Sequence, residues 1–569
     1  MEGLKTRRPL IILSIIFIIK GILWTIAVPL WQSPDEFGHF GYIQYVGERG
    51  KLPILGKTMI SKEVVSSFAY LDTARIMFNP DQKQRLQKNR YIGEFEDEIA
   101  GLKNVRREDS DILNYMAMHP PLYYFILSII YRMFRSFDLI SLAFLLRLFS
   151  IITGAVTVII SYHITKEIFP DESSSFLLLT PLIISFHPQF TFISSVISND
   201  NLVILLFSLY ILFIIRGIKN GISYSLSIIL GIILGLGMLT KISFIIGFPI
   251  YILFLLLIYK ITPSPCPLPL TLTLSPEGRG KGEGERVRVR GTNNARFIIT
   301  NGMITLAVSF CLTAPLILFN LFHNGVLLLN NTTYLLSLGN TSVTRNILTT
   351  ELFMKFAKKF FFYKMPDTYI GLFGNIDTRM PDIFYISFKF LLIASIIGVV
   401  YYLYICFYKK ESEHPLNYSI WFLIIPVIGT IGMFFIIDLM FLLRYNFPSI
   451  QGRHLFIIII PQVLLMIVGL IKIFPERYRP YPAYIFSIYF ILMNIVSLLL
   501  SIITRYYYDN NPANFIELTY KISQYKPFWG RYYIFIPLFF LFCLSLTLFL
   551  FLYFRYFRMV QEKRNAQNS

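Results

Sequence analysis

Residues 9–40 read PLIILSIIFIIKGILWTIAVPLWQSPDEFGHF, a long apolar segment that ends at an adjacent pair of acidic residues. A helix needs about 20 apolar residues to cross a lipid bilayer, and segments of this kind recur along the 569 residues. The chain is 55% hydrophobic with a mean hydropathy of +0.59, which is too apolar for a soluble protein. The sequence therefore predicts an all-α polytopic membrane protein.

The apolar segments predict about 12 transmembrane helices, within a range of 11–13. The candidate spans are 9–31, 139–163, 174–196, 200–216, 222–240, 243–260, 297–322, 384–408, 417–441, 454–474, 481–504 and 532–556. A shorter apolar segment at 120–136 begins with two prolines and contains Arg132 and Arg135. We expect this segment to form an amphipathic helix in the interface at the outer face of the membrane.

Basic residues give the expected orientation, because Lys and Arg collect in cytoplasmic loops. With 120–136 left out of the set of spans, the clusters at Arg216–Lys219, Lys409–Lys410 and Arg555–Arg564 fall on one side. We therefore expect a multi-pass protein of the cytoplasmic membrane, with both termini in the cytoplasm and large outer loops at 32–119 and 323–383. This distribution accounts for the net charge of +19 without a nucleic-acid partner.

Residues 262–292 differ from the rest of the chain because they are rich in Pro, Gly and charged residues. Such a composition cannot bury a core, so 261–296 is predicted to be a disordered basic insertion on the cytoplasmic side. The alternative is a basic patch that contacts anionic lipid. The four cysteines lie far apart and predict neither a disulfide nor a zinc site.

The acidic pair Asp35–Glu36 is the first candidate for a catalytic site. Placing carboxylates near hydrocarbon costs free energy, so they are rarely found there without a function. One carboxylate can act as a general base on a hydroxyl or amine, and its neighbour can bind a metal or the acceptor. The alternative is a helix start, with Ser33 as N-cap and Pro34 in the first turn. Both interpretations stay open on these residues alone.

His119 and Asp200 are candidate metal ligands. His119 lies in MHPPLYY (118–124), and Asp200 lies in SNDN (198–201) between two apolar segments. Imidazole nitrogen and carboxylate oxygen are common ligands of divalent ions. The alternatives are an interfacial histidine that contacts water and an aspartate that caps the next helix.

Three basic residues are candidates for binding a phosphate: Lys241 in GMLTK, Arg453 in QGRH, and Arg147. Lys241 and Arg453 fall on the predicted outer face, although basic residues generally collect on the cytoplasmic side. Lys can meet a phosphate as a point charge, and Arg can bind one through two parallel hydrogen bonds. The alternative for Lys241 is an ammonium that reaches water at a helix end. The alternative for Arg147 is a structural partner for a buried carboxylate or carbonyl.

Taken in order, the motifs PDE (34–36), HPPLYY (119–124), RLFS (147–150), SND (198–200), LTK (239–241) and QGR (451–453) resemble the GT-C superfamily of integral-membrane glycosyltransferases. The resemblance is to the branch that holds protein O-mannosyltransferases and lipid A aminoarabinose transferases. It covers residues 1–260 well and 384–475 loosely. It implies a GT-C-like helix bundle with a catalytic membrane module at 1–260 and the remaining transmembrane helices at 297–569.

The resemblance also implies a polyprenyl-phosphate-linked sugar as donor and transfer on the outer face of the membrane. Asp35 would match the catalytic carboxylate. Glu36 is the second catalytic candidate, and its expected task is to orient either the helix or the acceptor. Lys241 and Arg453 would hold the lipid-linked phosphate, and Arg147 is a third candidate for this role.

A divalent metal ion is a candidate cofactor on the same grounds. Asp200 would match the acidic residue of the second outer loop, and His119 takes the place where relatives often carry a metal-binding Glu. The acceptor, which is a lipid, a glycan or a protein, is left open.

Two other classes of function compete with the glycosyltransferase. A polymerase or ligase of surface polysaccharide would use a larger lipid-linked donor. A transporter or flippase of lipid-linked sugars would bind its substrate near the middle of the bilayer, usually between inverted repeats. The predicted polar residues gather on one face of the membrane, and this favours a transferase.

Overall fold

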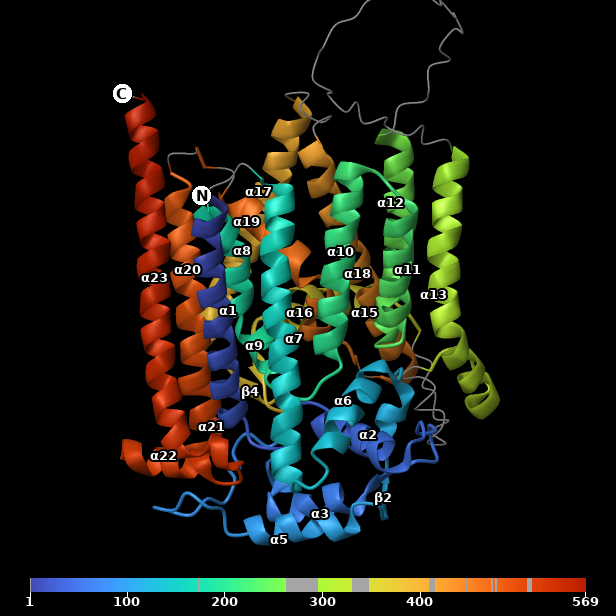
Figure 1. Cartoon of the computed structure of the whole chain (residues 1–569), viewed down its shortest axis with the longest axis vertical. Coiled ribbons are helices and arrows are strands. Elements are labelled where there is room, and N and C mark those ends of the chain that lie inside the picture. The colour runs from blue at the N-terminus through green and yellow to red at the C-terminus, as the bar shows by residue number, and fades with distance from the viewer. Residues whose placement is uncertain are drawn as a thin grey trace, which may run out of the picture.

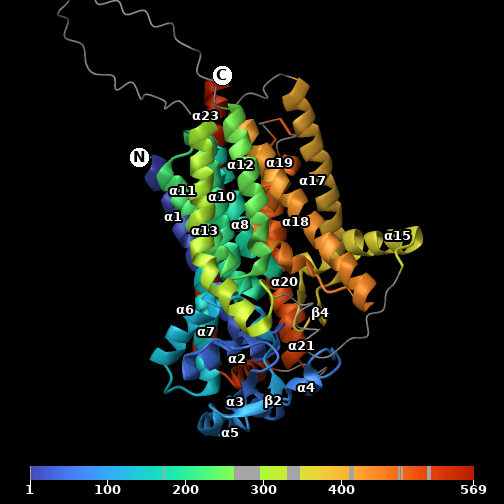
Figure 2. The ribbon, with the colours of Figure 1, turned by 90° about the vertical axis from the view of Figure 1, so that its right-hand side faces the viewer.

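The computed structural model describes residues 2–170, 174–261, 295–329, 347–408, 415–446, 448–471, 474–475, 478–508 and 514–568. Its long helices stand side by side as a bundle, and shorter elements gather at one end (Figures 1 and 2). The predicted insertion at 261–296 lies almost wholly outside the described residues.

The elements up to residue 261 are α1 (Glu2–Ala27), α2 (Glu36–Arg49), β1 (Met59–Ser61), α3 (Lys62–Tyr70), α4 (Thr73–Ile76), α5 (Glu96–Gly101), η1 (Leu102–Val105), β2 (Asp109–Leu113), η2 (Tyr115–Met118), α6 (Leu122–Met133), α7 (Leu139–Ile168), α8 (Ser174–Phe186), α9 (Pro188–Ser194), α10 (Asp200–Asn220), α11 (Tyr224–Met238), η3 (Ile242–Ile246) and α12 (Gly247–Ile261). The later elements are α13 (Ala295–Asn324), α15 (Thr350–Lys359), η4 (Phe360–Lys364), α16 (Met365–Ile370), β3 (Leu372–Phe373), β4 (Thr378–Arg379), α17 (Asp382–Tyr408), α18 (Pro415–Tyr445), η6 (Gly452–Ile458), α19 (Ile459–Ile471), α20 (Pro480–Val496), η7 (Ser497–Ile503), α21 (Thr504–Tyr507), α22 (Phe515–Ser523), η8 (Phe528–Gly530) and α23 (Tyr532–Asn568).

Ten of the described helices are long and apolar enough to cross a membrane. A bent pair, Phe176–Phe186 with Pro188–Ser194, brings the number of spans to as many as eleven. The larger count equals the lower limit of the predicted range of 11–13 and falls short of the predicted twelve, and the all-α membrane fold is confirmed. The remaining predicted span, 222–240, is the 15-residue helix α11, which is shorter than a typical membrane-spanning helix.

Helix α11 packs closely against α13 because two glycines face that helix. A Cβ atom at Gly231 would lie 2.7 Å from the carbonyl oxygen of Thr305, and one at Gly235 would lie 3.3 Å from that of Ser309. Two small residues four positions apart let helix backbones approach closely inside membranes. This contact keeps the end of α11 in place, and Lys241 follows that end.

The predicted span 174–196 is broken between α8 and α9 by an angle of 63°. The break falls at His187, which is extended (φ −66°, ψ 117°) because Pro188 follows it at the start of α9. Lys20 of α1 donates hydrogen bonds to the carbonyl of Ser185 and to the hydroxyl of Thr191. These bonds satisfy polar groups that the break frees inside an apolar bundle.

Residues 32–121 form a compact layer, here called the cap, over one end of the bundle (Figure 1). Its two-stranded sheet pairs β1 with β2 in antiparallel register, with Met59 opposite Leu113. A buried ion pair between Glu63 and Arg106, 2.7 Å long, ties the cap together. Both chain ends lie at the opposite end of the bundle (Figure 1).

The predicted amphipathic helix at 120–136 is α6, a 12-residue helix that packs against α2 of the cap. Its two arginines contact α2: Arg132 donates to the carbonyl of Gly47 at 3.0 Å, and Arg135 pairs with Glu48 at 2.6 Å. Helix α6 therefore joins the cap to the bundle just before α7 begins.

Candidate functional site

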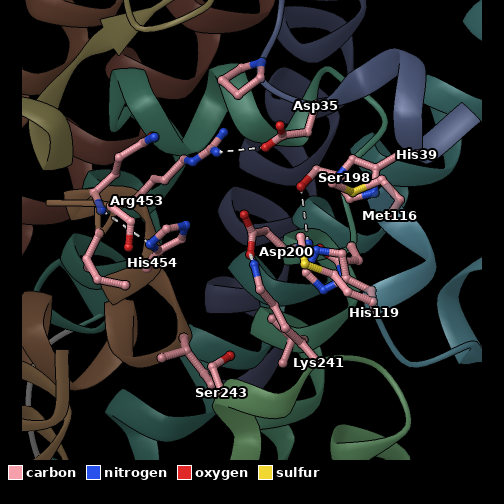
Figure 3. A pocket seen from close by; sticks show the side chains of 18 of the residues that line it. Asp35, His39, Met116, His119, Ser198, Asp200, Lys241, Ser243, Arg453 and His454 are labelled. Carbon is pink, nitrogen blue, oxygen red and sulfur yellow. Dashed lines mark hydrogen bonds and ion pairs between the residues drawn. The ribbon is translucent and has the colours of Figure 1, made fainter. Parts of the chain in front are cut away.

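Five of the predicted site residues meet in one cavity of about 390 Å³, here called the site cavity, which lies between the cap and the bundle. They come from five separate segments and face one another in Figure 3. The five residues are Asp35, His119, Asp200, Lys241 and Arg453. The fold thus brings together residues that lie up to 418 positions apart in the chain.

Asp35 enters the site cavity from a strained turn. It is the N-cap residue of α2, its backbone is left-handed (φ 64°), and its side chain makes no capping hydrogen bond. The hydroxyl of Tyr115 donates to one carboxylate oxygen at 2.9 Å, and Arg453 contacts the other at 3.4 Å. Ser33 is therefore not the N-cap, and a left-handed non-glycine residue that offers its carboxylate to a cavity is typical of a functional position.

Asp200 and Lys241 form a second ion pair in the same cavity, with 2.5 Å between Oδ1 and Nζ. Asp200 is the first residue of α10, whose N-cap is Asn199, so Asp200 is not the capping residue itself. Lys241 follows the end of α11, where its backbone N–H still donates to the carbonyl of Gly237. Both side chains are more than four-fifths buried, so this pair sits away from bulk water.

Arg453 is held in the cavity by the tight packing of the residue before it. Gly452 donates its backbone N–H to the hydroxyl of Thr368 at 2.6 Å. A Cβ atom at position 452 would lie 2.3 Å from the carbonyl oxygen of Met365, so only glycine fits there. Among the residues that the structure describes, the buried Nε of Arg453 has no hydrogen-bond partner, which leaves a donor available for a ligand.

Two histidines of the site cavity are neutral at physiological pH. Burial, with a smaller contribution from Lys241, lowers the pKa of both His39 and His119 to about 3. Their rings stack with 6.0 Å between centroids, and Nδ1 of His39 hydrogen-bonds to the hydroxyl of Tyr124 at 2.9 Å. Neutral imidazoles can accept or donate hydrogen bonds without adding charge beside the two ion pairs.

His39 and Tyr115 were not among the predicted site residues. His39 lies four positions after Asp35, which places both on the same side of a helix, and this spacing is visible in the sequence. Tyr115 carries no such signal, because it comes from the short helix η2, 80 residues away from the carboxylate it contacts. His454, the last residue of the QGRH motif, also lines the cavity.

The structure corrects the assignments of Glu36 and Arg147. The two side chains are fully buried and joined by two hydrogen bonds of 2.7 Å each. The remaining donors of Arg147 bind backbone carbonyls of residues 25–29, and Glu36 also accepts from the backbone of Ile197. Neither residue lines the site cavity. Arg147 has no donor left for a phosphate. The ion pair joins α7 to the start of α2, and the bonds to the carbonyls join α7 to the end of α1.

The predicted metal ligands do not complete a metal site. His119 and Asp200 both line the cavity, but the carboxylate of Asp200 is bound by Lys241. In the described parts of the chain, no group of three or more His, Cys, Asp or Glu residues is placed to hold a metal ion. A divalent cation here would also lie close to the charges of Lys241 and Arg453. This donor set does not fit a divalent metal, and no step of the chemistry below passes through one.

Comparison with known proteins gave one family and several structures. A family model described as a predicted membrane protein (DUF2142) matches residues 17–461. A search of curated protein sequences found no match.

Among solved structures, the chain is similar to the archaeal oligosaccharyltransferase AglB from Archaeoglobus fulgidus, in complex with an inhibitory peptide and a dolichol-phosphate. The TM-score is 0.47 and the sequence identity is 12%, over 88% of this chain and 56% of AglB. ArnT from Cupriavidus metallidurans, bound to undecaprenyl phosphate, is similar with a TM-score of 0.39 and 11% identity over 92% of this chain and 76% of ArnT. The chain therefore spans little more than half the length of AglB.

Proposed function

This chain belongs to the DUF2142 family of predicted membrane proteins, and we propose that it is a membrane glycosyltransferase that moves a sugar from a polyprenyl-phosphate donor to a hydroxyl or amine acceptor. One observation carries the proposal: two carboxylates and two cations, joined as the ion pairs Asp35–Arg453 and Asp200–Lys241, meet in a single cavity at one end of a membrane bundle. These are the groups that sugar transfer from a phosphate requires.

Asp35 is the proposed general base. The acceptor oxygen or nitrogen attacks the anomeric carbon of the sugar, and its proton passes to the Asp35 carboxylate. Tyr115 and Arg453 hold the two carboxylate oxygens, so the base is fixed before the acceptor arrives. Its side chain is 41% exposed, which leaves room for an acceptor to reach it.

Arg453 and Lys241 are the proposed partners of the leaving group. As the bond between the anomeric carbon and the phosphate oxygen breaks, its electron pair stays with the oxygen, and the lipid phosphate gains negative charge. Fixed cations that face this charge stabilise the transition state more than the ground state. Arg453 has an unpartnered Nε for this purpose, and Lys241 lines the same cavity (Figure 3).

An apolar groove supports a donor that carries a lipid. The groove has a volume of about 570 Å³ and is lined by α11, α12 and α13. A small pocket of about 20 Å³ shares Leu316 and Leu328 with this groove and Met118 and His119 with the site cavity, so the groove and the site cavity lie close to each other. In the proposed complex, the polyprenyl chain lies along the groove and its phosphate faces Lys241.

The base assignment is tested by Asp35→Asn in membranes supplied with radiolabelled polyprenyl-phosphate sugars. We expect transfer to fall by about 10²–10⁴-fold, the usual contribution of a general base, at an unchanged protein level. Asp111→Asn, which alters an exposed carboxylate of the same cap, is the matched control and should retain full activity. Undiminished transfer by the Asp35 variant would rule out this base.

The same assay separates the competing functions. A mass gain of one sugar in the product supports the transferase, whereas a gain of a whole repeat unit indicates a polymerase or ligase. Movement of an intact lipid-linked sugar across proteoliposomes without any product would indicate a flippase.

A further inference from the structure

Residues 350–370, which comprise α15, η4 and α16 and are here called the arm, lie across the direction of the long helices. In Figure 2, α15 projects from the side of the bundle and does not run along it. A helix in this orientation presents one side to the protein and leaves the other exposed. Its sequence, TELFMKFAKK, mixes apolar and basic residues.

The inner side of the arm packs on one aromatic residue of α18. The rings of Phe356 and Phe360 lie with their centroids 5.3 and 5.2 Å from that of Phe435. Both phenylalanines are buried. The arm therefore contacts α18 along this side.

The outer side of the arm combines large apolar side chains with positive charge. Met354 and Phe362 are 62% and 58% exposed, and the lysines at 355, 358 and 359 are exposed as well. Exposed aromatic and aliphatic side chains next to lysines are typical of helices that lie in the plane of a membrane interface. The positive charge complements anionic lipid headgroups.

The arm is also joined to the site cavity by two contacts. Lys364, the last residue of η4, pairs with the buried carboxylate of Asp438 at 2.8 Å, and the same carboxylate accepts the backbone N–H of Ile450 at 2.7 Å. The hydroxyl of Thr368 accepts the backbone N–H of Gly452. The two contacts hold the backbone at Ile450 and at Gly452, and Arg453 is the next residue in the chain.

We propose that the arm binds the anionic headgroup layer of the lipid bilayer and, through Lys364 and Thr368, sets the position of Arg453 in the site cavity. The lipid contact stands on the surface of the arm alone. Its effect on sugar transfer rests on the proposed function. Lys364 and Thr368 are positioning residues in this scheme, because they act through the segment that carries Arg453.

The lipid contact is tested by photo-crosslinking of the full-length protein in bilayers of phosphatidylcholine and phosphatidylglycerol. The photoreactive residue benzoylphenylalanine replaces Phe362 in the arm, Phe78 in the cap or Phe551 in α23, all of which are exposed. We expect position 362 to give lipid adducts enriched in phosphatidylglycerol over its mole fraction. Position 551 should give adducts without this preference, and position 78 should give none.

Charge removal sharpens this test. The triple variant Lys355→Gln, Lys358→Gln and Lys359→Gln should bring the adducts at position 362 back to the mole ratio of the two lipids. A lack of lipid adducts at position 362, or adducts that follow the mole ratio in the otherwise unchanged protein, would overturn the proposed contact.

The link to Arg453 is tested by Lys364→Met with donor kinetics measured in bilayers with and without phosphatidylglycerol. We expect the wild type to have a severalfold lower KM for the donor when this lipid is present. Lys364→Met should have the higher KM in both bilayers. Lys219→Met, which breaks an ion pair with Glu167 far from the arm, should keep the lipid dependence.

Equal lipid dependence in Lys364→Met and wild type, or a wild type indifferent to phosphatidylglycerol, would overturn the link. If the wild-type protein transferred no sugar in any bilayer, the proposed function would be refuted. The crosslinking experiment would then be the only test of the lipid contact.

Discussion

At the scale of single residues, Asp35 and Glu36 are neighbours that belong to different parts of the molecule. Asp35 faces the site cavity, whereas Glu36 is buried against Arg147. A left-handed backbone at a non-glycine residue costs roughly 1–2 kcal/mol, so it persists only where surrounding contacts enforce it. The Glu36–Arg147 pair is such a contact, since it fixes the residue that follows Asp35. The pair supports the carboxylate without touching the substrate.

This division of roles predicts how variants of the pair behave. Arg147→Met leaves the Glu36 carboxylate buried without its partner, and we expect about 3–5 kcal/mol of lost stability. Glu36→Gln keeps the shape and some hydrogen bonds, so its loss should be smaller. Thermal unfolding of the purified protein measures both, and transfer per folded molecule of Glu36→Gln should stay near the wild-type value. Full stability with abolished transfer would instead return Glu36 to a catalytic role.

At the scale of helices, the apolar segments of the sequence predicted nearly every span, but they did not reveal which proline breaks a helix. Pro9, Pro181, Pro315, Pro426 and Pro537 all lie inside continuous helices. Only at Pro188 does the described chain break within a predicted span. Membrane helices tolerate proline where neighbours satisfy the freed backbone groups, and at this break Lys20 does so from a distant helix. That partner is known only once the fold is known.

The contact between α11 and α13 gives a prediction at the same scale. Gly231→Ala places a methyl group 2.7 Å from the carbonyl oxygen of Thr305, so the helices must move apart, at a cost of about 1–3 kcal/mol. Gly432→Ala in α18 is the matched control, because a Cβ atom there meets nothing within 4 Å. Alanine favours helices over glycine by up to about 1 kcal/mol, so the control should be as stable as the wild type or more so. Equal melting temperatures for the two variants would contradict the close packing.

At the scale of the whole molecule, the sequence shows the order of the motifs along the chain, whereas their distances from one another in space are known only from the fold. Arg147 and Arg453 looked alike as phosphate-binding candidates, but the first is enclosed by α1 and the second opens into the site cavity. Tyr115 had no recognisable motif, since its role depends on a contact with Asp35 across the cap. Short motifs therefore predicted the location of the site better than the task of each residue.

The orientation of the molecule in the membrane is the last consequence of this arrangement. The chain ends and the cap lie at opposite ends of the bundle (Figure 1), and Arg216 and Lys219 lie near the end of α10 that is remote from Asp200. Because basic residues favour the cytoplasm, we expect the cap and the site cavity on the outer face. In a variant with its native cysteines replaced by serine, Asp111→Cys should react with a membrane-impermeant maleimide in intact cells. Gln567→Cys should react only after the cells are permeabilised. The reverse pattern would place the site cavity in the cytoplasm, where a donor delivered on the outer face could not reach Lys241 and Arg453.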